Sequence, residues 1–112
     1  MEKLELELKI HYGLDCQHFN VLAHSFAEYS KYQGFECSWE TVPEKLCLIH
    51  SEVSEALEAH RKDDKENFAE EIADIIIRCF DLAGRLNIDI HQAIYGKMMK
   101  NLERPLKHGK KY

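Results

Sequence analysis

The chain has 112 residues, of which 45% are hydrophobic and 31% charged, and its formal net charge is −5. These values predict one globular domain over residues 1–112 and exclude a membrane span, because no apolar run approaches the roughly 20 residues that a span requires. A net negative charge disfavours nucleic acid as a partner, so a polyanionic ligand should be small. The N-terminus lacks the apolar block of a signal peptide, which favours a cytoplasmic location.

The four cysteines are scattered along the chain and include no C-x-x-C pair. This spacing indicates neither a zinc site nor a disulfide framework. We expect free, buried thiols at Cys16, Cys37, Cys47 and Cys79.

The first third of the chain contains one ambiguous segment and one helix. Apolar residues alternate with charged ones at Leu4, Leu6, Leu8 and Ile10. This alternation is the pattern of a strand, but a lone strand has no partner in this chain, and the segment is left unassigned. A helix is predicted over residues 15–33. It begins at Asp15, a good N-cap, and ends before Gly34.

Three further helices are predicted where apolar residues recur at three- and four-residue steps, namely residues 44–62, 66–86 and 89–103. The polar segment 63–65 links the first two, and so short a link is consistent with antiparallel neighbours. A basic tail, residues 104–112, follows the last helix because a residue before proline is disfavoured from continuing it.

The helix over residues 66–86 carries apolar residues outside its main stripe. Ile77 and Phe80 project from another side, which favours burial against a second subunit. The sequence therefore predicts an all-α fold, a four-helix antiparallel bundle completed by oligomerisation.

Two pairs of acids flank the apolar stripes of the two central helices. Glu52 and Glu55 lie three residues apart on one helix, and Glu71 and Asp74 on the next, so each pair shares one side of its helix. Four converging carboxylates repel one another unless some bind protons or a cation. Mg²⁺, with Mn²⁺ as a substitute, prefers such oxygen ligands and keeps waters beside them.

A metal site is not the sole interpretation of these acids. Most acids in helices are simply exposed to solvent, and either pair alone would suit that interpretation better. A di-iron bundle is disfavoured because no histidine lies three residues after a glutamate. No P-loop glycine pattern is present.

A second polar set lies on the last helix. Lys97, Asn101 and Arg104 fall at i, i+4 and i+7 and share one face, which suits phosphate oxygens but equally suits a solvated helix end. Trp39, before the second predicted helix, is suited to stack on a nucleobase or to join the core.

These motifs resemble those of the MazG-type, all-α nucleoside triphosphate pyrophosphohydrolases. The family pattern, E-E-x-x-E followed by E-x-x-D, is matched by residues 51–55 and 71–74, with Ser51 in place of the first acid. The resemblance covers roughly residues 43–110 and includes the basic tail around Arg104-Pro105. It is closest to the short, single-domain branch.

The resemblance implies an enzyme that converts a (deoxy)nucleoside triphosphate to its monophosphate and pyrophosphate, in nucleotide-pool house-cleaning. It implies Mg²⁺ on Glu52, Glu55, Glu71 and Asp74, phosphate contacts from Lys97, Asn101 and Arg104, and a homodimer or homotetramer. Glu55 is our candidate for orienting the attacking water. Ser51 leaves four acids, which suit one ion better than two. The alternative is a non-catalytic helical module that binds a nucleotide or oligomerises.

Overall fold

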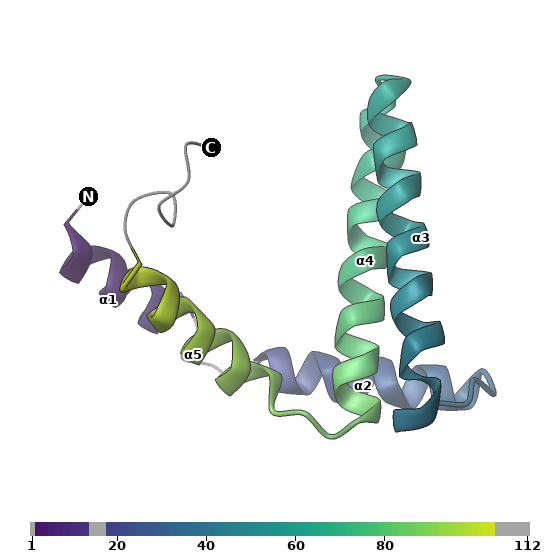
Figure 1. The fold of residues 1–112 in the computed structure, drawn as a ribbon, viewed down its shortest axis with the longest axis horizontal. Coiled ribbons are helices and arrows are strands. Elements are labelled where there is room, and N and C mark those ends of the chain that lie inside the picture. The colour runs from purple at the N-terminus through teal and green to yellow at the C-terminus, as the bar shows by residue number, and fades with distance from the viewer. Residues whose placement is uncertain (1, 14–17, 105–112) are drawn as a thin grey trace. The chain divides into compact units, whose positions relative to one another are not determined.

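The computed structural model describes residues 2–13 and 18–104, and these are helical apart from turns and short links (Figure 1). The elements in chain order are α1 (Lys3–Gly13), α2 (His18–Tyr32), a 3₁₀ turn (Trp39–Thr41), α3 (Val42–Arg61), α4 (Lys65–Arg85) and α5 (Ile90–Leu102). The all-α class is confirmed, and no strand occurs within the described ranges. None of the described helices combines the length and the apolar character needed to cross a membrane.

The chain divides into two compact units. One contains residues 1–20 and 89–112, and the other contains residues 21–88. The expectation of a single domain stays a prediction. The expected N-cap at Asp15 and most of the basic tail, residues 105–112, lie outside the described residues.

In the first unit, α1 is a helix over the residues whose alternation resembles a strand. Leu, Glu and Lys dominate this segment and all favour helix, whereas a strand needs a partner. Lys3 pairs with Glu103 at 2.7 Å, and the His11 and Tyr95 rings lie 6.0 Å apart. These two contacts align α1 antiparallel to α5.

In the second unit, α3 and α4 form an antiparallel hairpin, as the short link predicts (Figure 1). Asp63 adopts a left-handed conformation with φ of 53°, and the Asp64 amide donates to the Ala59 carbonyl at 3.0 Å, which closes the end of α3. The Asp64 side chain then accepts a hydrogen bond from the Asn67 amide at 3.0 Å and caps α4. The link is therefore set by local chemistry.

Helix α2 crosses α4 at Gly84. A Cβ atom on Gly84 would clash with the backbone carbonyl of Ala23 and lie 2.9 Å from the Ala27 Cβ. Only glycine allows the two helices to approach so closely. This contact fixes α2 beside the C-terminal half of α4.

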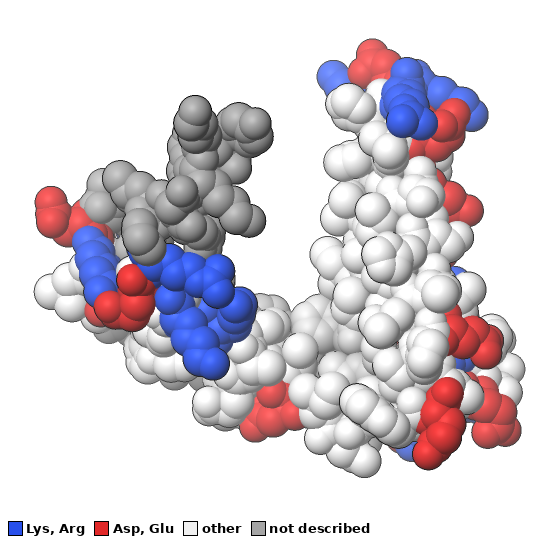
Figure 2. Space-filling model, viewed as in Figure 1, with Lys and Arg blue, Asp and Glu red and all other residues white. Residues whose placement is uncertain are grey.

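The buried apolar residues of the second unit are all alanines, namely Ala23, Ala27, Ala56, Ala59 and Ala83. The larger apolar residues of α3 and α4 are only partly covered, and Leu57 and Ile76 remain 49% and 48% exposed. Cys37, Cys47 and Cys79 are free thiols, as predicted. Cys47 and Cys79 are exposed and Cys37 is only partly buried, so the expectation of burial is wrong for all three. Two helices cover only the residues directly between them, and Figure 2 shows a long uncharged surface along the hairpin, with charges gathered at its tip and along one edge.

Candidate metal centre

Three of the predicted acids converge between α3 and α4. Glu52, Glu55 and Glu71 each offer one carboxylate oxygen, and these oxygens all lie within 4.8 Å of one another. The three-residue spacing places the first two on one side of α3, and the antiparallel hairpin brings Glu71 of α4 opposite them. We call these three residues the acid cluster. Asp74, one turn further along α4, is not part of it.

The acid cluster contains polar atoms that the described residues leave unsatisfied. The Glu52 carboxylate is only 13% exposed, and its Oε1 accepts a hydrogen bond from the Arg78 Nε at 3.1 Å. The Oε2 atoms of Glu52 and Glu71 are buried and have no hydrogen-bond partner among the described residues. Buried carboxylate oxygens without partners are costly, so this cluster is suited to bind a cation or a set of hydrogen-bond donors.

The pKa of Glu71 reflects the same crowding. Its pKa is raised to about 7, first because its protonated form can share a hydrogen bond with Glu52, then because of burial, and then because of Glu55. Like charges at close range disfavour a further negative charge. The cluster therefore retains a proton near neutral pH when no cation is bound.

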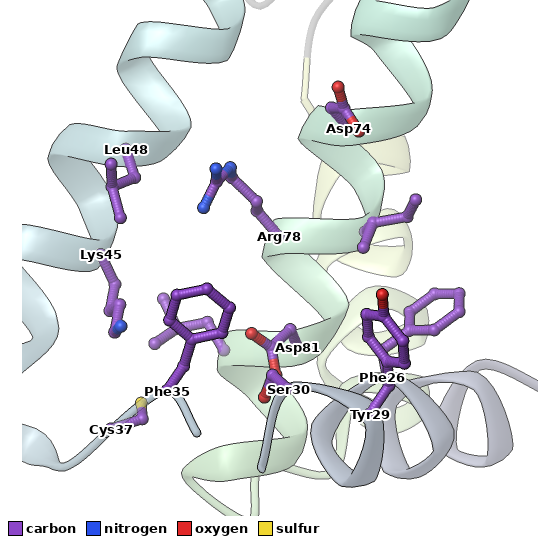
Figure 3. A pocket seen from close by; sticks show the side chains of 12 residues that line it. Phe26, Tyr29, Ser30, Phe35, Cys37, Lys45, Leu48, Asp74, Arg78 and Asp81 are labelled. Atoms are coloured by element: carbon purple, nitrogen blue, oxygen red, sulfur yellow. The ribbon is translucent and has the colours of Figure 1, made fainter. Parts of the chain in front are cut away.

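The second unit contains a pocket of about 370 Å³, and Figure 3 shows the side chains that line it. Asp74 and Arg78 of α4 line it, and Arg78 also contacts the cluster through Glu52. Aromatic rings from α2 and the segment after it form much of the wall, namely Phe26, Tyr29 and Phe35. The pocket thus combines apolar walls with charged side chains, as small-molecule sites do.

A hydrogen-bonded network closes one end of this pocket. The Ser30 hydroxyl donates to Asp81 Oδ1 at 2.6 Å, and the Arg85 Nη1 donates to the Ser30 Oγ at 2.7 Å. Arg85 also donates through Nη2 to the Phe35 carbonyl at 2.7 Å. The network ties α2, the segment that follows it and α4 together.

Asp81 lies on the side of α4 that faces the pocket. Its helical position puts it away from the seam with α3, but α2 also packs on α4 and forms part of the pocket wall on this side. Asp74, Arg78, Asp81 and Arg85 recur at steps of four, three and four residues. This regular polar stripe was the signal that could have revealed the pocket.

The other predicted substrate contacts belong neither to the acid cluster nor to the lining of the pocket. Lys97, Asn101 and Arg104 belong to the first unit, where Lys97 is exposed and the Asn101 Oδ1 is buried without a hydrogen-bond partner among the described residues. Trp39 is 73% exposed and does not line the pocket. Their contact with a substrate stays a prediction.

The family model that matches this chain is that of the MazG-like family, over residues 44–112. The match covers more than half of the chain, α3 to α5 included, and the chain belongs to the MazG-like family. No curated protein matches it, and no solved structure matches it.

Proposed function

We propose that this protein is a Mg²⁺-dependent nucleotide pyrophosphohydrolase, which converts a nucleoside triphosphate to the monophosphate and pyrophosphate in cytoplasmic nucleotide-pool house-cleaning. The acid cluster in a MazG-like chain carries the proposal, because two of its buried oxygens have no partner among the described residues. Family membership supports the reaction class, and the cluster supports the cation.

The donor set fits a hard divalent cation. Glu52, Glu55 and Glu71 supply carboxylate oxygens within reach of one ion, and Asp74 is one turn away on α4. When bound, Mg²⁺ supplies positive charge for phosphate oxygens and carries water molecules, and Mn²⁺ accepts the same ligands. Glu55 is the exposed member of the cluster, so it is the carboxylate we assign to orient the attacking water.

The pocket suits the organic part of a nucleotide. Its volume of about 370 Å³ lies in the range of small-molecule sites, and its aromatic walls suit a planar base. Further contacts from Trp39, and phosphate contacts from Lys97, Asn101 and Arg104, belong to the same proposal.

The test is an assay of pyrophosphate release from a panel of nucleoside and deoxynucleoside triphosphates, with Mg²⁺ and with chelator. We expect pyrophosphate and the monophosphate in equal amounts, only with Mg²⁺, and from a subset of the panel. Equal activity in chelator, or orthophosphate as the sole product, would refute the proposal.

A second candidate function is a non-catalytic module that binds a nucleotide. The ion pair between Arg78 and Glu52 favours this second function, because it already neutralises part of the negative charge of the acid cluster. This alternative predicts that a triphosphate raises the melting temperature in the presence of Mg²⁺ without any turnover. The same panel, followed by thermal unfolding, separates the two functions.

We further propose a homodimer or homotetramer that completes a four-helix bundle from hairpins of more than one chain. The partly exposed stripe on α3 (Leu46, Val53, Leu57) and that on α4 (Phe68, Ile72, Ile76) support it. Exposed apolar stripes of this kind are typical of helix–helix interfaces. Light scattering on the purified protein gives the number of chains directly.

A further inference from the structure

Arg78 stands between the acid cluster and the pocket. Its Nε donates to Glu52 Oε1 at 3.1 Å, and the same side chain lines the pocket (Figure 3). The Glu52 bond is the only hydrogen bond that its guanidinium makes within the described part of the chain, so the two Nη groups keep their donors. The side chain is 41% exposed and has room to turn.

A divalent cation and Arg78 compete for the same carboxylate. Glu52 has two oxygens, of which Oε1 holds Arg78 and Oε2 is free for another ligand. A cation on the acid cluster adds two positive charges near the guanidinium, and like charges at such range repel. Binding of the cation therefore weakens the ion pair between Glu52 and Arg78.

The pocket offers the released guanidinium an anionic partner when a polyphosphate enters. Arginine binds phosphate oxygens in a bidentate fashion that lysine cannot reproduce. On the basis of the proposed function, we propose that Arg78 exchanges Glu52 for a substrate phosphate when the metal binds. Arg78 thus competes with the metal in the free protein and binds the polyphosphate chain of the substrate in the loaded protein.

This exchange predicts opposite effects of one substitution on two ligands. In Arg78→Met, we expect Mg²⁺ alone to bind about fivefold more tightly, because the competing cation is gone. At saturating Mg²⁺, we expect inorganic tripolyphosphate, which has no base, to bind at least about tenfold more weakly. Calorimetric titration measures both affinities without turnover.

Three further variants sharpen the test. Arg78→Gln, which is neutral but still donates to Glu52, should behave as Arg78→Met does, and it replaces that variant if the methionine protein does not fold. Arg78→Lys keeps the charge and should retain near-normal Mg²⁺ affinity and part of the tripolyphosphate binding. Arg61→Met removes an arginine that pairs with Glu58 at 3.7 Å, far along α3 from the pocket, and should change neither affinity.

The outcomes separate this inference from the proposed function. If the wild type releases pyrophosphate with Mg²⁺ but the Arg78 variants bind either ligand as the wild type does, the exchange is wrong and the function stands. Unchanged tripolyphosphate binding in Arg78→Met would show that Arg78 does not bind the polyphosphate. If the wild type binds no Mg²⁺, both proposals fail.

Discussion

At the scale of single residues, the carboxylates of Glu52, Glu55 and Glu71 meet because a three-residue spacing on α3 acts together with the antiparallel hairpin of α3 and α4. Glu52 and Glu55 could be assigned to one face of a helix because three-residue steps fix that face wherever a helix forms. Their closeness to Glu71 follows once α3 and α4 are paired as an antiparallel hairpin. The role of Arg78 could not be predicted, because its pairing with Glu52 depends on how α3 and α4 are rotated against each other.

Glu71 provides the sharpest test at this scale. We expect Glu71→Gln to lower turnover at least about a hundredfold and to retain the fold. Glutamine resembles the protonated carboxyl that the raised pKa favours in the metal-free protein, so packing is preserved. Pyrophosphate release and far-ultraviolet circular dichroism measure the two effects.

The matched control is Glu70→Gln, on the neighbouring residue of α4, which is exposed and outside the acid cluster. It should keep normal turnover. Loss of helicity in Glu71→Gln would instead make Glu71 a structural residue.

At the scale of elements, helix limits were predictable because they depend on local chemistry. The helices α3, α4 and α5 begin and end within about two residues of the predicted limits. Asp64 caps the start of α4 and Asp89 caps the start of α5, and local turns end the helices. Helix α1 was not predictable from alternation alone. The crossing of α2 on α4 depends on Gly84, whose importance appears only once both helices are placed.

Gly84 and Gly96 should respond to alanine in opposite directions. Gly84→Ala adds a Cβ into the Ala23 backbone, so we expect a loss of about 1–3 kcal/mol in the free energy of unfolding. Gly96, in α5, has nothing within 4 Å of an added Cβ, and Gly96→Ala should gain about 0.5–1 kcal/mol. Urea unfolding of both variants checks the pair, and equal losses would contradict the close crossing.

Asp89 at the start of α5 gives a prediction about pH. Hydrogen bonds from the Gln92 amide and the Asn20 side chain hold the pKa of Asp89 below its usual value. Its carboxylate therefore stabilises the folded protein above the unfolded pKa near 3.8, and this contribution is lost as the pH falls through the lower folded pKa.

Asp89→Asn keeps a capping oxygen but cannot titrate. Between about pH 5 and pH 3 the wild type should lose more stability than this variant. Unfolding free energies over a pH series measure the difference, and parallel curves for the two proteins would show that Asp89 contributes no pH dependence.

At the scale of the whole molecule, the oligomer stays a prediction. Ile77 and Phe80 suggested a second subunit from pattern alone, but Ile77 lines the pocket and the Phe80 ring lies 6.3 Å from that of Phe26 in α2. The large residues that remain exposed along α3 and α4, beside a seam of alanines, support the proposal instead. The arrangement of subunits could not be predicted, because an apolar stripe specifies that a partner is needed but not its orientation.

The interface proposal predicts the effect of a charge on the α4 stripe. Ile76 is 48% exposed in the single chain and lies in the proposed interface. Ile76→Lys should convert the oligomer to smaller species, because the interface would bury the lysine charge without a partner. Val21→Lys, on an exposed apolar residue of α2 outside both stripes, should leave the assembly intact. Light scattering after size-exclusion chromatography distinguishes them, and an unchanged mass for Ile76→Lys would place the interface elsewhere.

The most direct test of the metal centre is calorimetric titration of the nucleotide-free protein with Mg²⁺ or Mn²⁺. We predict saturable binding of about one ion per chain to the wild type and to Glu70→Gln, since the three carboxylates of the acid cluster, with Asp74 one turn away on α4, suit a single ion. Glu71→Gln should lose this binding. No binding to the wild type, or equal binding to Glu71→Gln, would contradict the assignment of Glu52, Glu55 and Glu71 as a metal site.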